Sequence, residues 1–179
     1  MFKFNHLMIV NLVVLFFYIK KTALQISAQL ENLKKFYTIG EDFRWYIKLK
    51  CCNCGEETPE FVYCSLGETY PAPHGKSSCS LILKCKLCKR ENSLDIIKDS
   101  LCSYTSEDSG KFKTILVFDC RGVTPIDFSP RVGWEAVGLE SDTSFTDIDL
   151  SSSEWYDYDE KAGNSVSITE LKFQFVIVK

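Results

Sequence analysis

Alternation of apolar and polar side chains runs through most of the chain and predicts β-strands. In residues 24–30, for example, Leu24, Ile26 and Ala28 alternate with polar side chains. The same pattern predicts strands at 43–50, 61–64, 78–84, 93–97, 113–120 and 165–178. In the segment 113–120 we expect Ile115, Val117 and Cys120 to point inward. No long window has a helical apolar period, so the sequence predicts a mainly β, antiparallel, sandwich-like domain with little helix.

A weak internal repeat suggests that this β-rich domain contains two related halves. Residues 28–33 followed by 43–45 resemble residues 118–123 followed by 132–134. In both places a strand breaks at a turn, and a segment with a tryptophan follows, Trp45 in the first and Trp134 in the second. Duplication explains the similarity, but chance similarity between β-rich segments is the alternative.

The strongest chemical signal is a pair of two-cysteine motifs. Cys51 and Cys54 form the first, Cys85 and Cys88 form the second, and thirty residues separate the two motifs. Each C-x-x-C turn holds two thiolates close together, and four sulfurs complete the closed tetrahedral shell of a structural zinc ion. A thioredoxin-like redox pair requires a βαβ context, which the pattern lacks. We therefore expect a zinc-ribbon-like double knuckle with one Zn²⁺ per chain.

Length and charge limit the remaining classes of function. The chain has 179 residues, of which 45% are hydrophobic, and this predicts one globular domain over residues 21–179. A net charge of -3 argues against a nucleic-acid binder. Lys84, Lys86 and Lys89 surround the second motif, where they would neutralise a negatively charged Zn(Cys)₄ unit. Nine carboxylates and no basic residue lie between Arg131 and Lys161, which predicts a solvated acidic face or a site for a basic partner.

The first twenty residues form a hydrophobic leader that we place outside the domain. Its apolar run from Leu7 to Ile19 is interrupted by Asn11 and is shorter than the roughly 20 residues that span a bilayer. The leader resembles a signal peptide or short anchor, or it reflects a wrongly assigned start codon. Zinc-bound thiolates favour a reducing compartment, so we expect a cytoplasmic protein without membrane contact unless the leader is genuine.

Five further cysteines lie outside the two motifs. Cys52 is predicted to be a spare thiol near the metal. Cys64, Cys79, Cys102 and Cys120 lie in or near apolar segments, and all four are expected to be buried as small hydrophobic residues.

Catalytic patterns are scarce. The only histidines are His6, in the leader, and His74, in a loop rich in proline and glycine. Neither has a neighbouring nucleophile or acid that indicates a catalytic triad. Asp157 and Asp159 form a carboxylate pair, but without partner residues they are interpreted as part of a solvated acidic loop. We therefore expect no enzymatic activity.

Several separated motifs resemble one known family. They are Gly40–Tyr46, Leu49–Cys51 with Cys54–Glu56, Lys84–Cys88 with Arg90–Ser93, Phe118–Gly122, Pro125–Phe128 and Asp157–Lys161. Together they are similar to the eukaryotic CXXC motif containing zinc-binding proteins, over about residues 21–179. The resemblance implies a small, mostly β protein with one zinc ion, whose ligands carry over to Cys51, Cys54, Cys85 and Cys88. It also implies a link to metal-trafficking partners. Cys52 departs from the family pattern.

Two functional hypotheses follow. In the first, the zinc ion is structural and the chain is a monomeric, non-enzymatic module that binds another protein, with the acidic segment around Trp155 as the candidate surface. In the second, the chain is a metal-handling or thiol-redox accessory protein that uses a labile zinc site and Cys52. The sequence names neither the partner nor the process.

Overall fold

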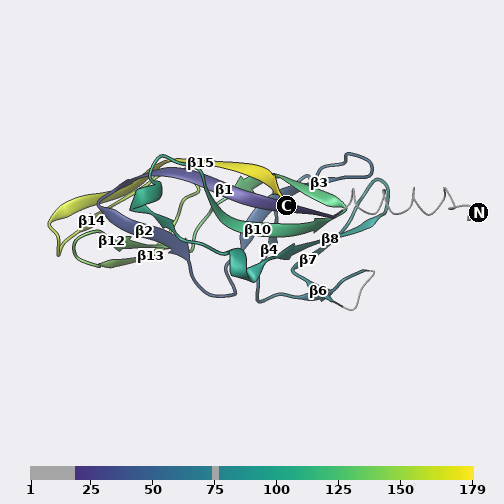
Figure 1. Cartoon of the computed structure of the whole chain (residues 1–179), viewed down its shortest axis with the longest axis horizontal. Coiled ribbons are helices and arrows are strands. Elements are labelled where there is room, and N and C mark those ends of the chain that lie inside the picture. Colours follow the sequence, from purple (N-terminus) through teal and green to yellow (C-terminus); the bar gives the residue numbers. More distant parts are fainter. Residues whose placement is uncertain (1–18, 74–76) are drawn as a thin grey trace, which may run out of the picture.

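The structure, a computed structural model, describes residues 19–73 and 77–179, and it is elongated (Figure 1). Residues 1–18, which make up nearly all of the leader and include His6, lie outside the described residues, as does His74. Within the described part, no helix is both long and apolar enough to cross a membrane. The helical content there is two short 3₁₀ turns, η1 (Lys98–Ser100) and η2 (Ser106–Asp108).

One six-stranded antiparallel sheet runs along the length of the molecule. Its strand order is β14–β15–β1–β10–β8–β7. The bounds are β1 (Ile19–Glu31), β7 (Leu81–Lys84), β8 (Glu91–Ile96), β10 (Lys113–Arg121), β14 (Trp155–Asp159) and β15 (Asn164–Val178). The long strands β1 and β15 pair from Lys21 with Val178 to Glu31 with Ser167, and therefore join the two ends of the molecule (Figure 1).

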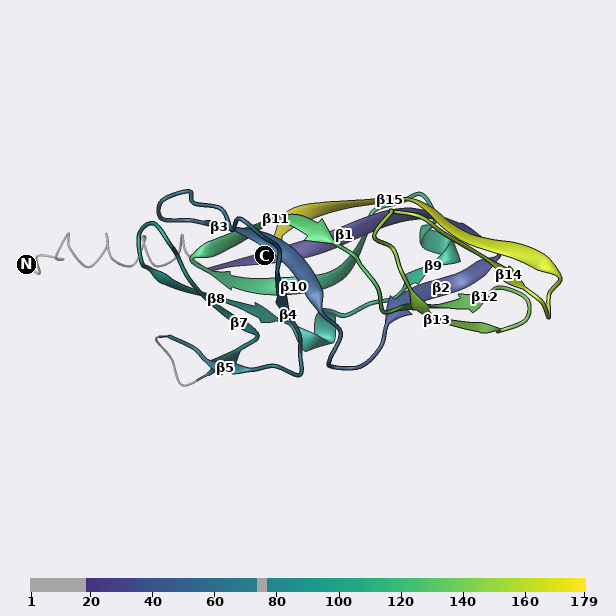
Figure 2. The same ribbon diagram turned by 180° about the vertical axis from the view of Figure 1, so that it is seen from behind.

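Smaller sheets complete each end. The first has the order β11–β3–β4 and consists of β3 (Trp45–Cys51), β4 (Val62–Cys64) and β11 (Val123–Ser129). The second has the order β13–β12–β2–β9 and consists of β2 (Leu33–Thr38), β9 (Tyr104–Thr105), β12 (Trp134–Gly138) and β13 (Ser144–Ile148). β5 (Tyr70–Pro71) and β6 (Ser78–Cys79) form a separate two-stranded ribbon. Figure 2 shows the first small sheet at the end of the molecule opposite the second.

The strand pairing repeats in two halves, as the internal repeat predicts. Apart from β9 and the β5–β6 ribbon, which have no counterparts, the strand order is unchanged when β1 exchanges with β10, β2 with β11, β3 with β12, β4 with β13, β7 with β14 and β8 with β15. β1 leads into β2 through Asn32, and β10 leads into β11 through Gly122; both turn residues have positive φ angles, 51° and 80°. Each half therefore leaves the large sheet at one left-handed residue and enters a small sheet.

An aromatic cluster fills the centre between the two halves. Trp45 begins β3 and Trp134 begins β12, and both side chains are 1% exposed. Their rings meet edge to face with centroids 5.8 Å apart, and Phe43 packs against both at 4.8 and 5.3 Å. The two predicted tryptophan segments thus meet in one core, where aromatic pairs of this geometry add to the energy of burial.

The mainly β, antiparallel prediction with little helix is confirmed, and three details of it are wrong. The predicted strand 78–84 is two strands, β6 and β7, because Ser80 interrupts it and its hydroxyl donates to Asp95 at 2.8 Å. In β10 the buried side chains include Leu116 and Phe118, whereas Val117 is only half-buried. The register of β1 and β10 shifts after Leu24, and this bulge changes the alternation.

The third correction concerns the segment interpreted as a solvated acidic loop. Residues 155–159 form β14, at the edge of the six-stranded sheet. Asp157 is exposed, but Asp159 is only 1% exposed. The polar composition of the segment gave no sign of a strand, and the carboxylate at its end, that of Asp159, is buried.

Candidate metal centre

The two cysteine motifs occupy turns that follow β3 and β7. The backbone N–H of Cys51 donates to the carbonyl of Glu56 at 2.8 Å, and Gly55 N–H donates to the Cys51 carbonyl at 2.9 Å. Gly55 has a φ of +80°, a conformation that glycine adopts at little cost. The second turn repeats this geometry from Cys85, with Lys89 at the left-handed position and a φ of 63°. The second knuckle therefore has the same shape as the first, although it lacks the glycine.

The structure brings the four predicted thiols together. The sulfurs of Cys51, Cys54, Cys85 and Cys88 all lie within 4.8 Å of one another. The Sγ atoms of Cys51 and Cys88 are 3.8 Å apart, and those of Cys54 and Cys85 are 3.5 Å apart. Zinc–sulfur bonds of about 2.3 Å in a tetrahedron place the sulfurs about 3.8 Å apart. The donor set therefore fits one Zn²⁺ per chain.

The four cysteines of the cluster differ in how deeply they are buried. Cys51 and Cys85 are buried at 4% exposure, whereas Cys54 and Cys88 are partly exposed. The buried Asn92 side chain points its Nδ2 at the Cys51 sulfur, 3.9 Å away. Contacts of this kind from outside the ligand set orient metal ligands and tune their basicity.

Hydrogen bonds separate the pKa values of the two partly exposed thiols. The backbone N–H of Arg90 lowers the pKa of Cys88 to about 6, against the effect of burial and with help from the Asn53 side chain. At Cys54 the backbone N–H of Glu56 acts in the same direction, but burial and hydrogen bonds to the other three thiols raise the pKa to about 12. The Cys88 sulfur is thus ready as a thiolate, and a bound metal ion would displace the proton that Cys54 holds.

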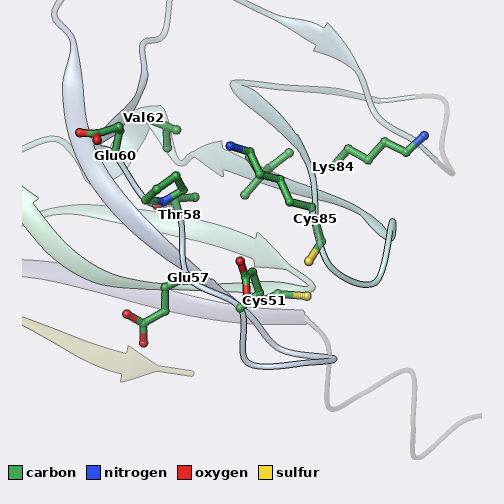
Figure 3. A pocket seen from close by; sticks show the side chains of 11 residues that line it. Cys51, Glu57, Thr58, Glu60, Val62, Lys84 and Cys85 are labelled. Carbon is green, nitrogen blue, oxygen red and sulfur yellow. The ribbon is translucent and has the colours of Figure 1, made fainter.

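A pocket of about 230 Å³ opens beside the cluster. Cys51 and Cys85 contribute to its lining, together with Val62 and Leu83. Figure 3 shows the sulfurs of Cys51 and Cys85 close together at one side of this pocket, with the Lys84 side chain extending away from them. The two most buried ligands can therefore be approached from one side through a small apolar opening.

Comparison with known proteins decides the family. A family model described as "CXXC motif containing zinc binding protein, eukaryotic" matches residues 23–176. This chain belongs to that family. The match begins at Ala23 and so leaves out the hydrophobic leader.

Two mammalian relatives and one solved structure agree with this family assignment. The CXXC motif containing zinc binding proteins of Mus musculus and Homo sapiens are 50% and 49% identical over 156 residues, which is 87% of this chain and 98% of each relative. The solved structure "Crystal Structure of C1orf123" aligns with a TM-score of 0.85 and 48% identity, over 88% of this chain and 99% of the other. A hypothetical protein from Plasmodium falciparum shares the fold, with a TM-score of 0.80 at 20% identity, over 88% and 99% of the two chains.

The other cysteines divide differently from the prediction. Cys64, Cys79 and Cys120 are buried, and burial raises the pKa of all three thiols, to about 12 for Cys120. Cys102 is exposed, so its predicted burial is wrong: it lies in the loop between η1 and β9, beside the apolar Leu101 that suggested a core position. Cys52 is exposed and lies 3.3 Å from the Thr124 hydroxyl, outside the metal cluster.

The second half of the fold has two turns equivalent to those that carry the zinc ligands. These turns, which we call the Asp159 turns, are residues 138–143 after β12 and residues 159–164 after β14. Gly138 N–H donates to the Thr143 carbonyl at 2.8 Å, and Gly163 N–H donates to the Asp159 carbonyl at 2.7 Å, in the pattern of the cysteine turns. Asp142 and Gly163 take the left-handed positions, with φ angles of 53° and 69°.

The two Asp159 turns are linked by hydrogen bonds to one carboxylate, whereas the two cysteine turns bring four sulfurs together. The Asp159 carboxylate accepts the hydroxyls of Ser141 and Thr143 and the backbone N–H groups of Lys161 and Ala162. The Ser141 hydroxyl lowers the pKa of Asp159, against burial and together with the Ala162 N–H and the Thr143 hydroxyl. In chain position Asp159 corresponds to Cys85, and Ser141 corresponds to Cys54. Sequence reasoning missed this cluster because its signal appears only when the repeat is aligned turn by turn.

Proposed function

We propose that this zinc-binding protein is a non-enzymatic, cytoplasmic and monomeric protein-interaction module whose zinc is structural. The observation that carries the proposal is the closed set of four thiols from two turns that thirty residues separate. Four protein ligands complete the zinc shell, so a substrate would find no open position on the metal. The ion would join two loops that have little else to hold them together, and metal binding and folding would be coupled.

The strand β14 supports the interaction role. It forms an edge of the six-stranded sheet, so one side of its backbone faces away from β15. Tyr156 and Tyr158 are 64% and 55% exposed beside the exposed carboxylates of Glu154 and Asp157. The Trp155 ring is half-buried against Phe145 at 5.5 Å, so the tyrosines provide the exposed aromatic surface. Exposed aromatic rings next to acidic groups suit a basic partner.

Metal content and thiol reactivity, measured together on the full chain, test the structural role of the zinc. Of the nine cysteines, Cys52 and Cys102 are exposed and outside the cluster. We therefore expect one zinc per chain and two thiols that react at once with a thiol reagent. In Cys52→Ser/Cys102→Ser both fast-reacting thiols should disappear while the zinc content is unchanged. Substoichiometric zinc, or fast reaction of thiols in the double variant, would contradict a structural site.

A metal-handling role is the second candidate, and the pocket beside Cys51 and Cys85 favours it. An opening at two ligands gives a partner thiol a route to the ion. This role requires zinc to exchange quickly with a chelator while the chain stays folded, and it requires Cys52→Ser to slow that exchange. Zinc that leaves only as the chain unfolds, at the same rate in Cys52→Ser, would exclude it.

A further inference from the structure

The outer face of the β11–β3–β4 sheet carries a continuous alternation of cations and aromatic rings (Figure 2 shows the sheet). We call it the cation–aromatic stack, and its members are Arg44, Tyr63, Tyr46, Arg131, Phe61 and Lys48. The Arg44 guanidinium lies 4.6 Å from the Tyr63 ring centroid, and the Tyr63 and Tyr46 centroids are 5.7 Å apart. Arg131 lies 3.8 Å from the Tyr46 centroid and 5.9 Å from that of Phe61, and Lys48 covers Phe61 at 5.0 Å.

Strand register produces this arrangement. In β3 the side chains of Trp45, Ile47 and Leu49 point inward, so Tyr46 and Lys48 point outward. Tyr46 pairs with Tyr63 of β4 and with Ser129 of β11, two residues before Arg131. The stack is thus built on paired strands, and aromatic faces hold the guanidinium groups in place.

Within the described residues the three cations of the stack form no close ion pair, although the charge of Glu68 acts on Arg44 at longer range. Among residues 19–73 and 77–179, no carboxylate oxygen lies within 4 Å of the charged nitrogens of Arg44, Lys48 or Arg131, although six other ion pairs occur there. The neighbouring Glu68 accepts the hydroxyls of Tyr63 and Tyr70. A chain with net charge -3 therefore keeps a cluster of positive charge on this face.

A pocket lined by both apolar and polar side chains adjoins the stack. Its volume is about 420 Å³, and Phe61 belongs both to its lining and to the stack. Phe128, Leu171 and Phe173 add further apolar surface, and Phe128 and Phe173 meet edge to face with centroids 5.9 Å apart. The exposed Lys172 also lines the pocket, and its Nζ lies 3.6 Å from a carboxylate oxygen of Glu170, so its charge is already partly compensated. An apolar anchor and a carboxylate on the same ligand would find their complements side by side.

We infer that this face binds an acidic segment of a partner protein, with an apolar side chain of that segment in the pocket at Phe61. The inference rests on the proposed interaction role and assigns to it a second surface, for an acidic partner segment, in addition to the β14 surface that suits a basic one. Carboxylates would bind the guanidinium edges of Arg44 and Arg131, which form paired hydrogen bonds with such groups. Nucleic acid also stacks and carries negative charge, but the phenylalanine side chains that line the adjoining pocket, Phe61, Phe128 and Phe173, suit an apolar amino-acid side chain better than a sugar–phosphate backbone.

Fluorescence anisotropy on the full zinc-bound chain tests the inference. The probe is a short labelled peptide of glutamate and phenylalanine, compared with the same peptide carrying serine for phenylalanine. Arg44→Gln/Arg131→Gln removes the two stacked guanidinium groups. Lys34→Gln/Lys98→Gln is the matched control, since it removes two charges from exposed ion pairs elsewhere. Zinc content and circular dichroism verify that both variants fold.

We expect the glutamate–phenylalanine peptide to bind the control like the unaltered chain and to bind Arg44→Gln/Arg131→Gln about tenfold more weakly. The serine peptide should bind the unaltered chain more weakly. Equal binding to the two double variants, or no binding at all, would overturn the inference. Tighter binding of an oligonucleotide than of the peptide would also overturn the inference. Self-association of the chain that requires Arg44 and Arg131, and that the peptide does not disrupt, would overturn it as well.

The peptide-binding experiment and the test of the proposed function can fail independently of each other. A basic peptide that binds at β14, while acidic peptides do not bind, would overturn this inference and leave the interaction role standing. Labile zinc with reactive ligand thiols would contradict the structural site without changing the peptide measurements.

Discussion

The two ends of the molecule solve the same structural problem with different chemistry. At the zinc end, the turns 51–56 and 85–90 meet through four sulfurs. At the opposite end, the turns 138–143 and 159–164 meet through Asp159 and its hydroxyl and N–H donors. The turns at the two ends have the same backbone shape, but different chemical groups link them. The difference teaches that a metal site can be one of several ways to fasten a repeated scaffold.

The zinc site and the Asp159 hydrogen-bond cluster differ in how much they stabilise the fold and in what that stabilisation depends on. Structural zinc contributes about 10–16 kcal/mol of apparent binding free energy in small zinc-binding peptides, and its effect vanishes with the metal. A hydrogen-bonded carboxylate depends on several small contributions and on its own ionisation. The zinc end should therefore respond to chelators, and the Asp159 end to substitution of one residue.

Removal of a zinc ligand should have the largest effect. We expect Cys85→Ser to lose zinc and more than about 4 kcal/mol of unfolding free energy, because without the metal the two cysteine turns keep only weak contacts such as that of Arg90 with Asn53 at 3.4 Å. Zinc analysis and urea unfolding measure this. Cys52→Ser is the matched control, since that thiol is exposed and outside the cluster. Full zinc content in Cys85→Ser would contradict the ligand assignment.

A second metal site at the Asp159 end would remove the difference between the ends. The aligned positions are Gly138, Ser141, Asp159 and Ala162. Cysteine at all four should raise the metal content from one zinc per chain to two, because the turns already have the backbone of a zinc knuckle. Metal analysis after purification with zinc measures it. If the fourfold variant folds and still holds one zinc, the equivalence of the turns is wrong.

Loss of the carboxylate should weaken only its own end. In Asp159→Ala, Ser141 and Thr143 lose their shared acceptor, so we expect a fall of several degrees in the melting temperature with zinc fully retained. Hydrogen exchange should quicken at 138–143 and 159–164 and stay unchanged at 51–56. Asp157→Ala, at an exposed position of the same strand, should behave like the unaltered chain. Equal melting temperatures for the two variants would show that the Asp159 cluster is dispensable.

Acid should open the two ends at different pH values, which is the smallest effect. The pKa of Asp159 lies below its ordinary value of 3.8, so its contribution is complete above pH 3.8 and is lost as the pH falls through the lowered value. Zinc needs deprotonated thiols, so protons compete with the metal at higher pH. Residue-resolved exchange along a pH series should show residues 51–56 opening first. Simultaneous opening of both ends would contradict this order.

The sequence predicted the zinc end well because its signal is local. Cys51 with Cys54, and Cys85 with Cys88, each lie within one turn, and such spacing is legible without the fold. The Asp159 cluster joins Ser141 to a carboxylate eighteen positions away, and only the pairing of β12, β13, β14 and β15 brings them together. Composition alone therefore made the acidic segment look solvated.

For the strands too, burial that follows from the residues of one strand was predicted, and burial that depends on pairing with another strand was not. The alternation in β1 and β3 placed Leu24, Ile26 and Trp45 correctly in the core. The phase error in β10 comes from a bulge at Ile115, which the pairing with β1 skips and which the alternation of β10 alone does not reveal. Cys102 was misplaced because an apolar neighbour is weak evidence of burial in a loop.

The crossed pairing of the small sheets has a consequence for how such a chain can diverge. β2 of the first half pairs with β12 of the second, and β3 pairs with β11, so each half completes its sheet with a strand of the other. This is the connectivity of a strand-swapped homodimer whose two subunits have been joined into one polypeptide. In a symmetric dimer a substitution alters both copies at once. In the joined chain each copy changes alone, and here one carries four cysteines where the other carries glycine, serine, aspartate and alanine.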